Sequence, residues 1–227
     1  HGPQEELVMS ESNDPPVNQR VAAEYSGRGV FVDEGTILQP FDFARMVHEA
    51  VLKTDCRVNQ THADAQDAVF YLRHRCQLAH KAGRKTIFIG NGGSSAIASH
   101  MATDFTKNGG IRAIAFNDAP LLTCLANDFG SEAIFSKQLE YYAKAGDVVI
   151  IVSSSGRSPN ILQAAEQAFS QGLDLVTFSG MNPDNVLRRK GMINFWVPAK
   201  DYGIVELAHL TLLHSVISLQ NPSFDAK

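Results

Sequence analysis

The 227-residue sequence has little cysteine and no excess of positive charge, and each shortage argues against a class of protein. Its three cysteines, Cys56, Cys76 and Cys124, are odd in number and follow no metal-binding or redox spacing. We therefore expect buried free thiols in a reducing compartment. The formal net charge of -4 provides no basic surface for nucleic acid or for an anionic membrane.

Long apolar runs and targeting signals are also missing. No apolar run is long enough to span a bilayer and no signal peptide is visible, so we expect a cytoplasmic protein without a membrane partner. The hydrophobic fraction is 44%, which is enough for a sizeable core. We expect residues 1–40, which are polar and rich in proline, to form a partly disordered N-terminal extension, and residues 41–227 to form one domain.

After Lys85, short apolar segments alternate with amphipathic ones, which is typical of an α/β fold. The predicted strands are 85–89, 112–116, 147–152, 173–178 and 193–197. The predicted helices are 95–105, 132–143, 159–171, 183–189 and 204–219, preceded by two N-terminal helices within 41–82 that are separated near 56–61. Because the strands are almost continuously apolar, we expect a doubly wound, five-stranded parallel sheet that is covered on both faces.

Two loops directly follow predicted strands, and both fall at the carboxyl edge of the predicted sheet, where ligands bind. In Gly90–Ser94, glycines let the backbone approach an anion, and the next helix begins with amides that have no internal partner. Ser153–Pro159 offers hydroxyls, a second helix start and the charge of Arg157. The alternative is a flexible surface turn with Ser158 as a helix cap, but two such loops on one edge favour a phosphate site.

The glycine loop matches neither common nucleotide-binding motif. The Gly-Asn-Gly-Gly-Ser sequence lacks the third glycine spacing of the dinucleotide fingerprint, and no Gly-Lys-Ser or Gly-Lys-Thr follows it. Nucleotide binding is therefore disfavoured, and a smaller sugar phosphate fits better.

The predicted helix after the glycine loop carries His100 and Asp104, which share one face because they are four residues apart. They are a general acid/base pair, two metal ligands or an exposed polar pair. Their position behind the phosphate loop favours a functional role. Asn127 and Asp128 either contact substrate hydroxyls or form a turn before the next helix.

The last predicted helix carries Glu206, His209 and His214. Glu206 and His214 are eight residues apart, roughly 12 Å along a helix, so one small site that includes both is geometrically demanding and needs a partner subunit to complete it. We interpret His209 as a satisfied core histidine and His214 as a site residue.

The resemblance to a known family rests on four segments, in this order: FIGNGGSSAIASH, LANDFGSEAIFSKQLE, GDVVIIVSSSGRSPN and VELAHLTLLH. Together they resemble the sugar isomerase (SIS) domain and, within it, the sedoheptulose 7-phosphate isomerases, or phosphoheptose isomerases. The similarity covers roughly residues 41–219. It implies a flavodoxin-like SIS domain in a homotetramer, with active sites shared between subunits.

The resemblance also implies an activity. This is the aldose–ketose conversion of sedoheptulose 7-phosphate to D-glycero-D-manno-heptose 7-phosphate, by enediol proton transfer, in heptose biosynthesis for cell-surface polysaccharide or a related glycoconjugate. Two alternatives stay open: a non-catalytic SIS-domain protein that senses a sugar phosphate or associates with a replication initiator, and an isomerase of a different sugar phosphate.

The resemblance assigns roles to individual residues. Those expected to bind the substrate are Asn91, Gly92, Gly93, Ser94, Asn127, Asp128, Ser153, Ser154, Ser155, Ser158 and Glu206. Those expected to bind a divalent metal, with zinc the expected ion, are His100, Asp104, Glu206 and His214, of which Asp104 and His214 are also the expected catalytic residues.

Two of these residues depart from the family pattern, which usually has Glu at the position of Asp104 and Gln at that of Glu206. Asp is one methylene shorter, and a displacement of that order costs roughly a hundredfold in rate. The extra carboxylate is expected to tighten metal binding and to favour manganese or iron alongside zinc.

Overall fold

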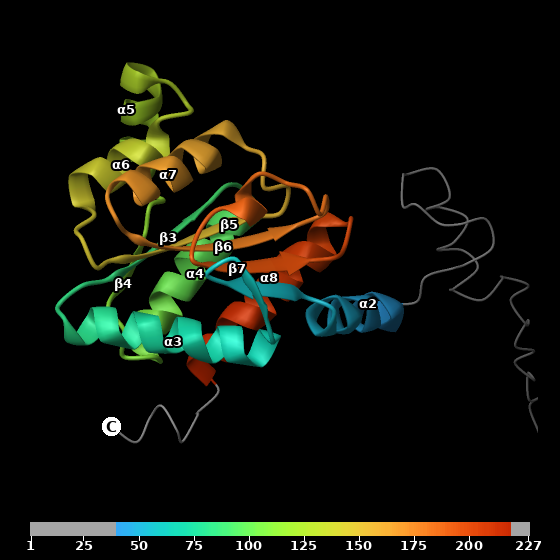
Figure 1. Ribbon diagram of the computed structural model, residues 1–227. Helices are drawn as coiled ribbons and strands as arrows, with labels where there is room; N and C mark the ends of the chain where they lie inside the picture. The colour runs from blue at the N-terminus through green and yellow to red at the C-terminus, as the bar shows by residue number, and fades with distance from the viewer. Residues whose placement is uncertain (1–39, 219–227) are drawn as a thin grey trace, which may run out of the picture. The chain divides into compact units, whose positions relative to one another are not determined.

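The computed structural model describes residues 40–218, and the extension predicted over residues 1–40 lies outside this part except for its last residue (Figure 1). The helices are α2 (Pro40–Leu52), α3 (Ala65–Lys81), α4 (Gly93–Lys107), α5 (Ala119–Phe129), α6 (Ile134–Tyr142), α7 (Pro159–Ser170), the 3₁₀ helix η1 (Leu187–Arg189) and α8 (Tyr202–Ser218). The strands are β1 (Asp55–Val58), β2 (Thr61–Ala63), β3 (Thr86–Gly90), β4 (Ala113–Ala115), β5 (Val148–Ser153), β6 (Asp174–Gly180) and β7 (Ile193–Val197).

The fold is α/β as predicted, but its sheet is larger than the predicted five-stranded parallel sheet. Its order is β2-β1-β7-β6-β5-β3-β4. The strands from β7 to β4 pair in parallel, whereas β1 pairs antiparallel to β7 and β2 antiparallel to β1. The sheet is therefore mixed and seven-stranded, and the predicted break near 56–61 is a β-hairpin.

The β-hairpin escaped prediction because its sequence lacks the usual signals. Its strands are short, and the four residues of β1 are Asp-Cys-Arg-Val, with two charges. Its turn is made by Asn59 and Gln60, which both have positive φ, where glycine is the more common choice. The antiparallel pairing therefore depends on β7, a partner distant in the sequence.

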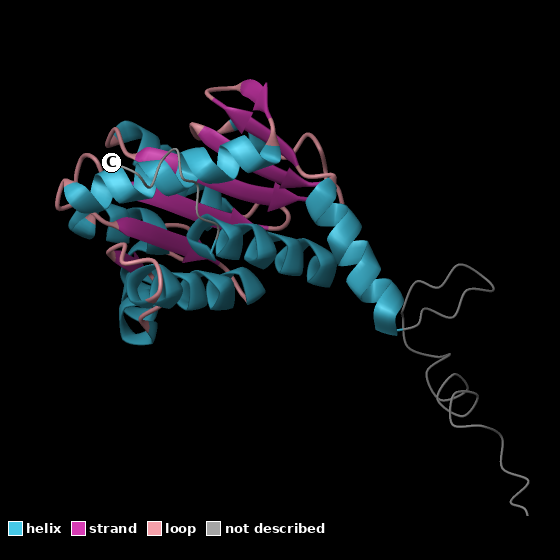
Figure 2. Ribbon diagram, turned by 90° about the horizontal axis from the view of Figure 1, so that it is seen from below, coloured by secondary structure: helices cyan, strands magenta, loops and turns pink. Residues whose placement is uncertain are grey.

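Helices cover both faces of the sheet (Figures 1 and 2). Along β5, Val149 and Ile151 belong to the core under α6 and α7, and Ile150 belongs to the core shared with α3, α4 and α8. Successive strand residues point to opposite faces, so an unbroken apolar strand serves both cores. This arrangement confirms the prediction of a sheet covered on both sides.

Two predicted helix assignments differ from the structure. The predicted helix 183–189 is only the single 3₁₀ turn η1, whereas α5 was not predicted at all. The signals for α5 are present: the Asp118 side chain accepts a hydrogen bond from the Leu121 N–H, Pro120 lies in the first turn and Gly130 follows the last residue. Asn127 and Asp128 therefore end a helix, and do not form a separate turn.

The cysteines are free, but only two of them are buried as predicted. Burial raises the pKa of Cys56 and of Cys76 to about 12. Cys124 is exposed on α5, so its predicted burial was wrong, because α5 places only Leu125 fully in the interior. Among the described residues, no helix is both long and apolar enough to cross a membrane.

Candidate active site

The glycine and serine loops lie side by side, because β3 and β5 are neighbouring parallel strands. Gly90 at the end of β3 pairs with Val152 near the end of β5. Numbered among themselves, the parallel strands have the order 2-1-3-4-5, and this pair is the point where the direction of winding reverses. Ligands in such sheets bind beyond the carboxyl ends of the strands at that point. The prediction that both loops share one edge is confirmed.

The glycine loop exposes backbone because side chains are excluded at Gly90 by lack of space and disfavoured at Gly92 by its positive φ. A Cβ on Gly90 would lie 2.5 Å from the carbonyl oxygen of Ser94. Gly92 has φ +54 and is the N-cap of α4, to which it contributes no side-chain hydrogen bond. The first amides of α4 are thus left for a ligand, in the manner typical of anion sites.

The serine loop presents a buried hydroxyl that lacks a partner. Ser153 and Ser154 are both buried, and the Ser153 Oγ accepts a 3.3 Å hydrogen bond from the Gly156 N–H. The Ser154 Oγ has no hydrogen-bond partner among the described residues. The Gly180 N–H donates to the carbonyl of Ser154 at 3.0 Å, which ties this loop to the end of β6. A buried hydroxyl without a partner is costly unless a ligand or water completes it.

Asn160, which we did not single out in the sequence, links the two loops. Its side chain exchanges two hydrogen bonds with Asn91, at 2.9 and 3.0 Å. Asn160 is the second residue of α7, directly after the serine loop, whereas Asn91 lies within the glycine loop. Two amides that meet only in the tertiary fold leave no signal in local sequence patterns.

A second cluster brings together three of the four predicted metal ligands: His100, Asp104 and His214 each offer one ligand atom, and these atoms lie within 4.8 Å of one another. The Nε2 atoms of the two histidines are 3.2 Å apart. The Asp104 Oδ2 is 3.6 Å from the His100 Nε2 and 3.6 Å from the His214 Nδ1. One chain is therefore enough to bring these three together.

This donor set fits a catalytic metal. Two nitrogen ligands at about 2.0–2.1 Å from a tetrahedral zinc ion are about 3.3 Å apart, close to the distance between the two histidines. Three protein ligands of the His/His/Asp type leave a fourth position for water or substrate. The side chain of Asp104 is 17% exposed, that of His214 38% and that of His100 51%, so the carboxylate is the most shielded member and the cluster is open to solvent on the side of His100.

The fourth predicted ligand, Glu206, lies elsewhere. Its carboxylate oxygens occupy the space that a Cβ on Gly93 would need. The structure therefore places it against the first residue of α4, beside the glycine loop, and not in the cluster of His100, Asp104 and His214. This position is compatible with its predicted contact with the substrate, and its role as a metal ligand stays a prediction.

Asn127 and Asp128 contact one another at the end of α5. The Asn127 Nδ2 donates to the Asp128 Oδ1 at 2.9 Å, and the Cys124 Sγ is 3.6 Å from the Asp128 Oδ2. All three side chains belong to exposed residues. In the described part of the chain, no hydrogen bond joins either residue to the two loops, so their predicted contact with substrate hydroxyls stays a prediction.

His209 is a core residue, as interpreted from the sequence. It is fully buried, its Nε2 is 3.0 Å from the carbonyl oxygen of Ser179, and its ring meets Phe178 edge-on. Burial lowers the pKa of this imidazole to about 4, so it is neutral at neutral pH.

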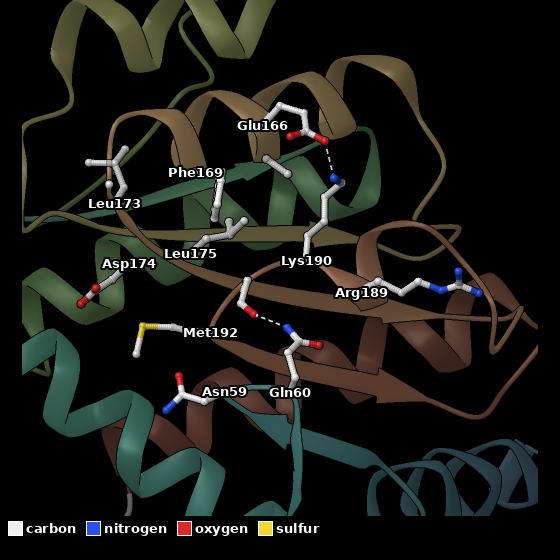
Figure 3. A pocket seen from close by; sticks show the side chains of 13 residues that line it. Asn59, Gln60, Glu166, Phe169, Leu173, Asp174, Leu175, Arg189, Lys190 and Met192 are labelled. Carbon is white, nitrogen blue, oxygen red and sulfur yellow. Dashed lines mark hydrogen bonds and ion pairs between the residues drawn. The ribbon is translucent and has the colours of Figure 1, made fainter.

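A cavity of about 620 Å³ lies at the other, amino edge of the sheet, near the start of β6 (Figure 3). Its polar groups largely satisfy one another: Lys190 forms an ion pair with Glu166, and the side chain of Gln60 donates to the carbonyl of Gly191. None of the predicted site residues lines it. The predicted site residues and this cavity therefore lie at different edges of the sheet.

Comparisons with known proteins agree with this site. A family model described as SIS domain matches residues 56–180. The chain is 39% identical over 142 residues to a phosphoheptose isomerase of Fusobacterium nucleatum, covering 60% of this chain and 72% of the relative. It is 37% identical over 151 residues to that of Burkholderia pseudomallei, covering 64% and 76%.

Among solved structures, the phosphoheptose isomerase GmhA from Neisseria gonorrhoeae matches with a TM-score of 0.66 and 25% identity, over 88% of this chain and 97% of that one. The matched fold, the two loops at its carboxyl edge and the sequence identity all agree. This chain belongs to the SIS domain family and, within it, to the phosphoheptose isomerases.

Proposed function

We propose that this protein is an aldose–ketose isomerase that converts sedoheptulose 7-phosphate into D-glycero-D-manno-heptose 7-phosphate. The observation that carries the proposal is that α4 joins one of two neighbouring anion-binding loops to the cluster of His100, Asp104 and His214. α4 begins at the glycine loop and carries His100 about two turns and Asp104 about three turns further on. One substrate molecule could therefore place its phosphate at the loops and its reacting carbonyl group at the cluster.

The phosphate end would be held by the two loops. The first amides of α4, the hydroxyls of Ser153, Ser154, Ser155 and Ser158, and the start of α7 supply hydrogen bonds to a phosphate without requiring a cation. The buried hydroxyl of Ser154 would gain in the complex the partner that it lacks in the free protein. Gly92, Gly93 and Ser94 would let the ligand approach the backbone closely.

The carbonyl end would react by proton transfer. The Asp104 carboxylate takes a proton from C1 of the open-chain ketose and returns it to C2, so that C1 is oxidised to the aldehyde and C2 is reduced. His214 moves the hydroxyl proton between O1 and O2, because an imidazole ring can both accept and donate a proton. Asn127, Asp128 and Glu206 would contact the sugar hydroxyls.

His100, Asp104 and His214 would hold a divalent metal, with Zn²⁺ the expected ion and Glu206 a further ligand. When bound, such an ion polarises carbonyl and hydroxyl oxygens. We further propose that the protein is a cytoplasmic homotetramer with active sites at subunit interfaces, and that its product enters a cell-surface polysaccharide or a related glycoconjugate.

An assay of the purified protein with five- to seven-carbon ketose phosphates, with and without a chelator, tests the proposal. We expect aldose formation to be fastest with sedoheptulose 7-phosphate, to be lost on chelation and to return with added Zn²⁺. No activity with any ketose phosphate of the panel would contradict the proposal that the protein is an enzyme. Faster conversion of another ketose phosphate would contradict the proposed substrate identity. Activity that persists with the chelator would contradict the proposal that a divalent metal is required.

A further inference from the structure

Asn91 is expected to bind the substrate, but no role has been assigned to Asn160 or to the reciprocal amide pair that it forms with Asn91 between the two loops. The Asn91 Nδ2 donates to the Asn160 Oδ1 at 2.9 Å, and the Asn160 Nδ2 donates to the Asn91 Oδ1 at 3.0 Å. The two residues are 69 positions apart in the sequence. The pair is thus a tertiary contact that closes a ring between the ends of β3 and β5.

The geometry of this pair fixes the separation of the loops. Two carboxamides exchange two hydrogen bonds only when they lie edge to edge, so the pair restrains both distance and orientation. Asn160 is restrained on its own side as well, because its Oδ1 also accepts the N–H of Ile161 at 2.9 Å in the first turn of α7. The start of α7 and the glycine loop therefore move together.

The loops have separate supports apart from this pair. The glycine loop is held from within α4, where the Ser95 N–H donates to the carbonyls of Asn91 and Gly92. The serine loop is held from the β6 side, by the Gly180 N–H on Ser154 and by the Leu187 N–H on the carbonyl of Gly156. Each loop thus keeps its own shape, the β3–β5 pairing brings the two loops side by side, and the amide pair adds the side-chain contact that fixes the start of α7 relative to Asn91.

We propose that Asn160 is a positioning residue, which holds the serine loop at the distance from the glycine loop that one phosphate group needs. This inference rests on the proposed function for the identity of the substrate, but the phosphate site is required only to bind an anion. Asn160 acts through Asn91 and does not itself contact the phosphate. Its loss therefore weakens binding only as long as Asn91 is present.

The test is a double-mutant cycle on inorganic phosphate binding, measured by isothermal titration calorimetry at constant ionic strength. Asn160→Ala is expected to weaken phosphate binding about tenfold, the size expected for the loss of two neutral hydrogen bonds. Asn160→Ala added to Asn91→Ala is expected to cause no further loss. Gln163→Ala, an exposed position on the same helix, is the matched control and leaves binding unchanged.

Two results would overturn the proposal. If the losses from Asn91→Ala and Asn160→Ala multiply, Asn160 acts independently of Asn91. If Asn160→Ala binds phosphate like the wild type, the pair has no positioning role. The thermal midpoint of Asn160→Ala should fall below that of Gln163→Ala, because hydrogen bonds of the free protein are lost, so the loss of phosphate affinity that depends on Asn91 is the readout that a merely structural role would not move.

If Asn160→Ala does not fold, Asn160→Asp replaces it. The carboxylate introduced by this substitution keeps the shape of the amide, but it faces the Asn91 oxygen with a second oxygen and adds a negative charge beside the anion site. It is expected to weaken phosphate binding by more than tenfold, and wild-type affinity in this variant would overturn the proposal. Because phosphate binding is read without turnover, an inactive wild type would contradict the proposed function and leave this inference standing.

Discussion

The two edges of the sheet differ in what they offer a ligand. At the amino edge, the cavity is lined by charged groups that have partners: Lys190 pairs with Glu166 (Figure 3), and Asp174 pairs with Arg75, which lies outside the lining. At the carboxyl edge, Ser154 keeps a buried hydroxyl without a partner and α4 begins without a side-chain cap. The comparison teaches that a buried hydroxyl without a partner, next to a helix start without a side-chain cap, indicates this site better than the volume of a cavity.

The largest expected effect comes from removing the carboxylate at the carboxyl edge. Asp104→Asn should lower turnover of sedoheptulose 7-phosphate by about a thousandfold, because general-base catalysis contributes a factor of about 10²–10⁴. Phosphate binding should persist, because the loops are unchanged. Steady-state kinetics and calorimetry measure the two effects. Full activity in this variant would remove Asp104 from the mechanism.

His209 tests whether a buried histidine outside the cluster affects stability only. Its pKa is about 4 when folded, against an ordinary value of 6.5. Between these values the unfolded chain binds a proton that the folded chain does not. The free energy of unfolding should therefore fall by about 2 kcal/mol from pH 7 to pH 5 through this group.

The control for this prediction is His209→Gln, which has no titratable side chain at that position. Urea unfolding at both pH values should give a shallower pH dependence for this variant than for the wild type. An equal dependence in the two proteins would show that His209 is not the group responsible.

Ser154 sharpens the comparison because stability and affinity should change in opposite directions. Ser154→Ala removes a buried hydroxyl without a partner, so the protein should become no less stable, while sugar-phosphate binding weakens about tenfold. Ser153→Ala is the matched control: its Oγ accepts the Gly156 N–H, and its loss should lower the thermal midpoint. If Ser154→Ala lowers stability and leaves affinity unchanged, the Ser154 hydroxyl has a structural role and does not bind the phosphate.

The smallest effect is expected at the amino edge. Lys190→Ala removes an exposed ion pair with Glu166, and such pairs contribute about 0–1 kcal/mol. Turnover and phosphate affinity should equal those of the wild type. A tenfold change in turnover or in phosphate affinity would show that the amino edge also takes part in function, which would contradict the difference between the two edges.

Local patterns predicted the elements that carry the site. The apolar strand Val148–Ser153 and the glycine break after β3 are readable without the fold, and parallel topology then brings their loops together. The β-hairpin of β1 and β2 was not predictable in this way, because its pairing depends on β7. Helix α5 was predictable in principle from its Asp118 cap and its terminal Gly130, and was missed.

The candidate site was predictable to the level of residue types, but not of all contacts. His100 and His214 meet because α4 and α8 pack side by side, which the sequence alone left open. The Glu206 carboxylate lies against Gly93, the first residue of α4, and it fits there because glycine has no side chain. The link between Asn91 and Asn160 joins residues whose separation is set only by the finished sheet.

The central claim is that phosphate is held at the two loops while Asp104 moves a carbon-bound proton. The most direct measurement is the isomerisation of sedoheptulose 7-phosphate in deuterated water, followed by NMR of the recovered sugar phosphates. We predict that the wild type introduces deuterium at C2 of the aldose and C1 of the ketose, and that Asp104→Asn introduces none while still binding phosphate. Turnover without any deuterium, or equal exchange in both proteins, would contradict the claim.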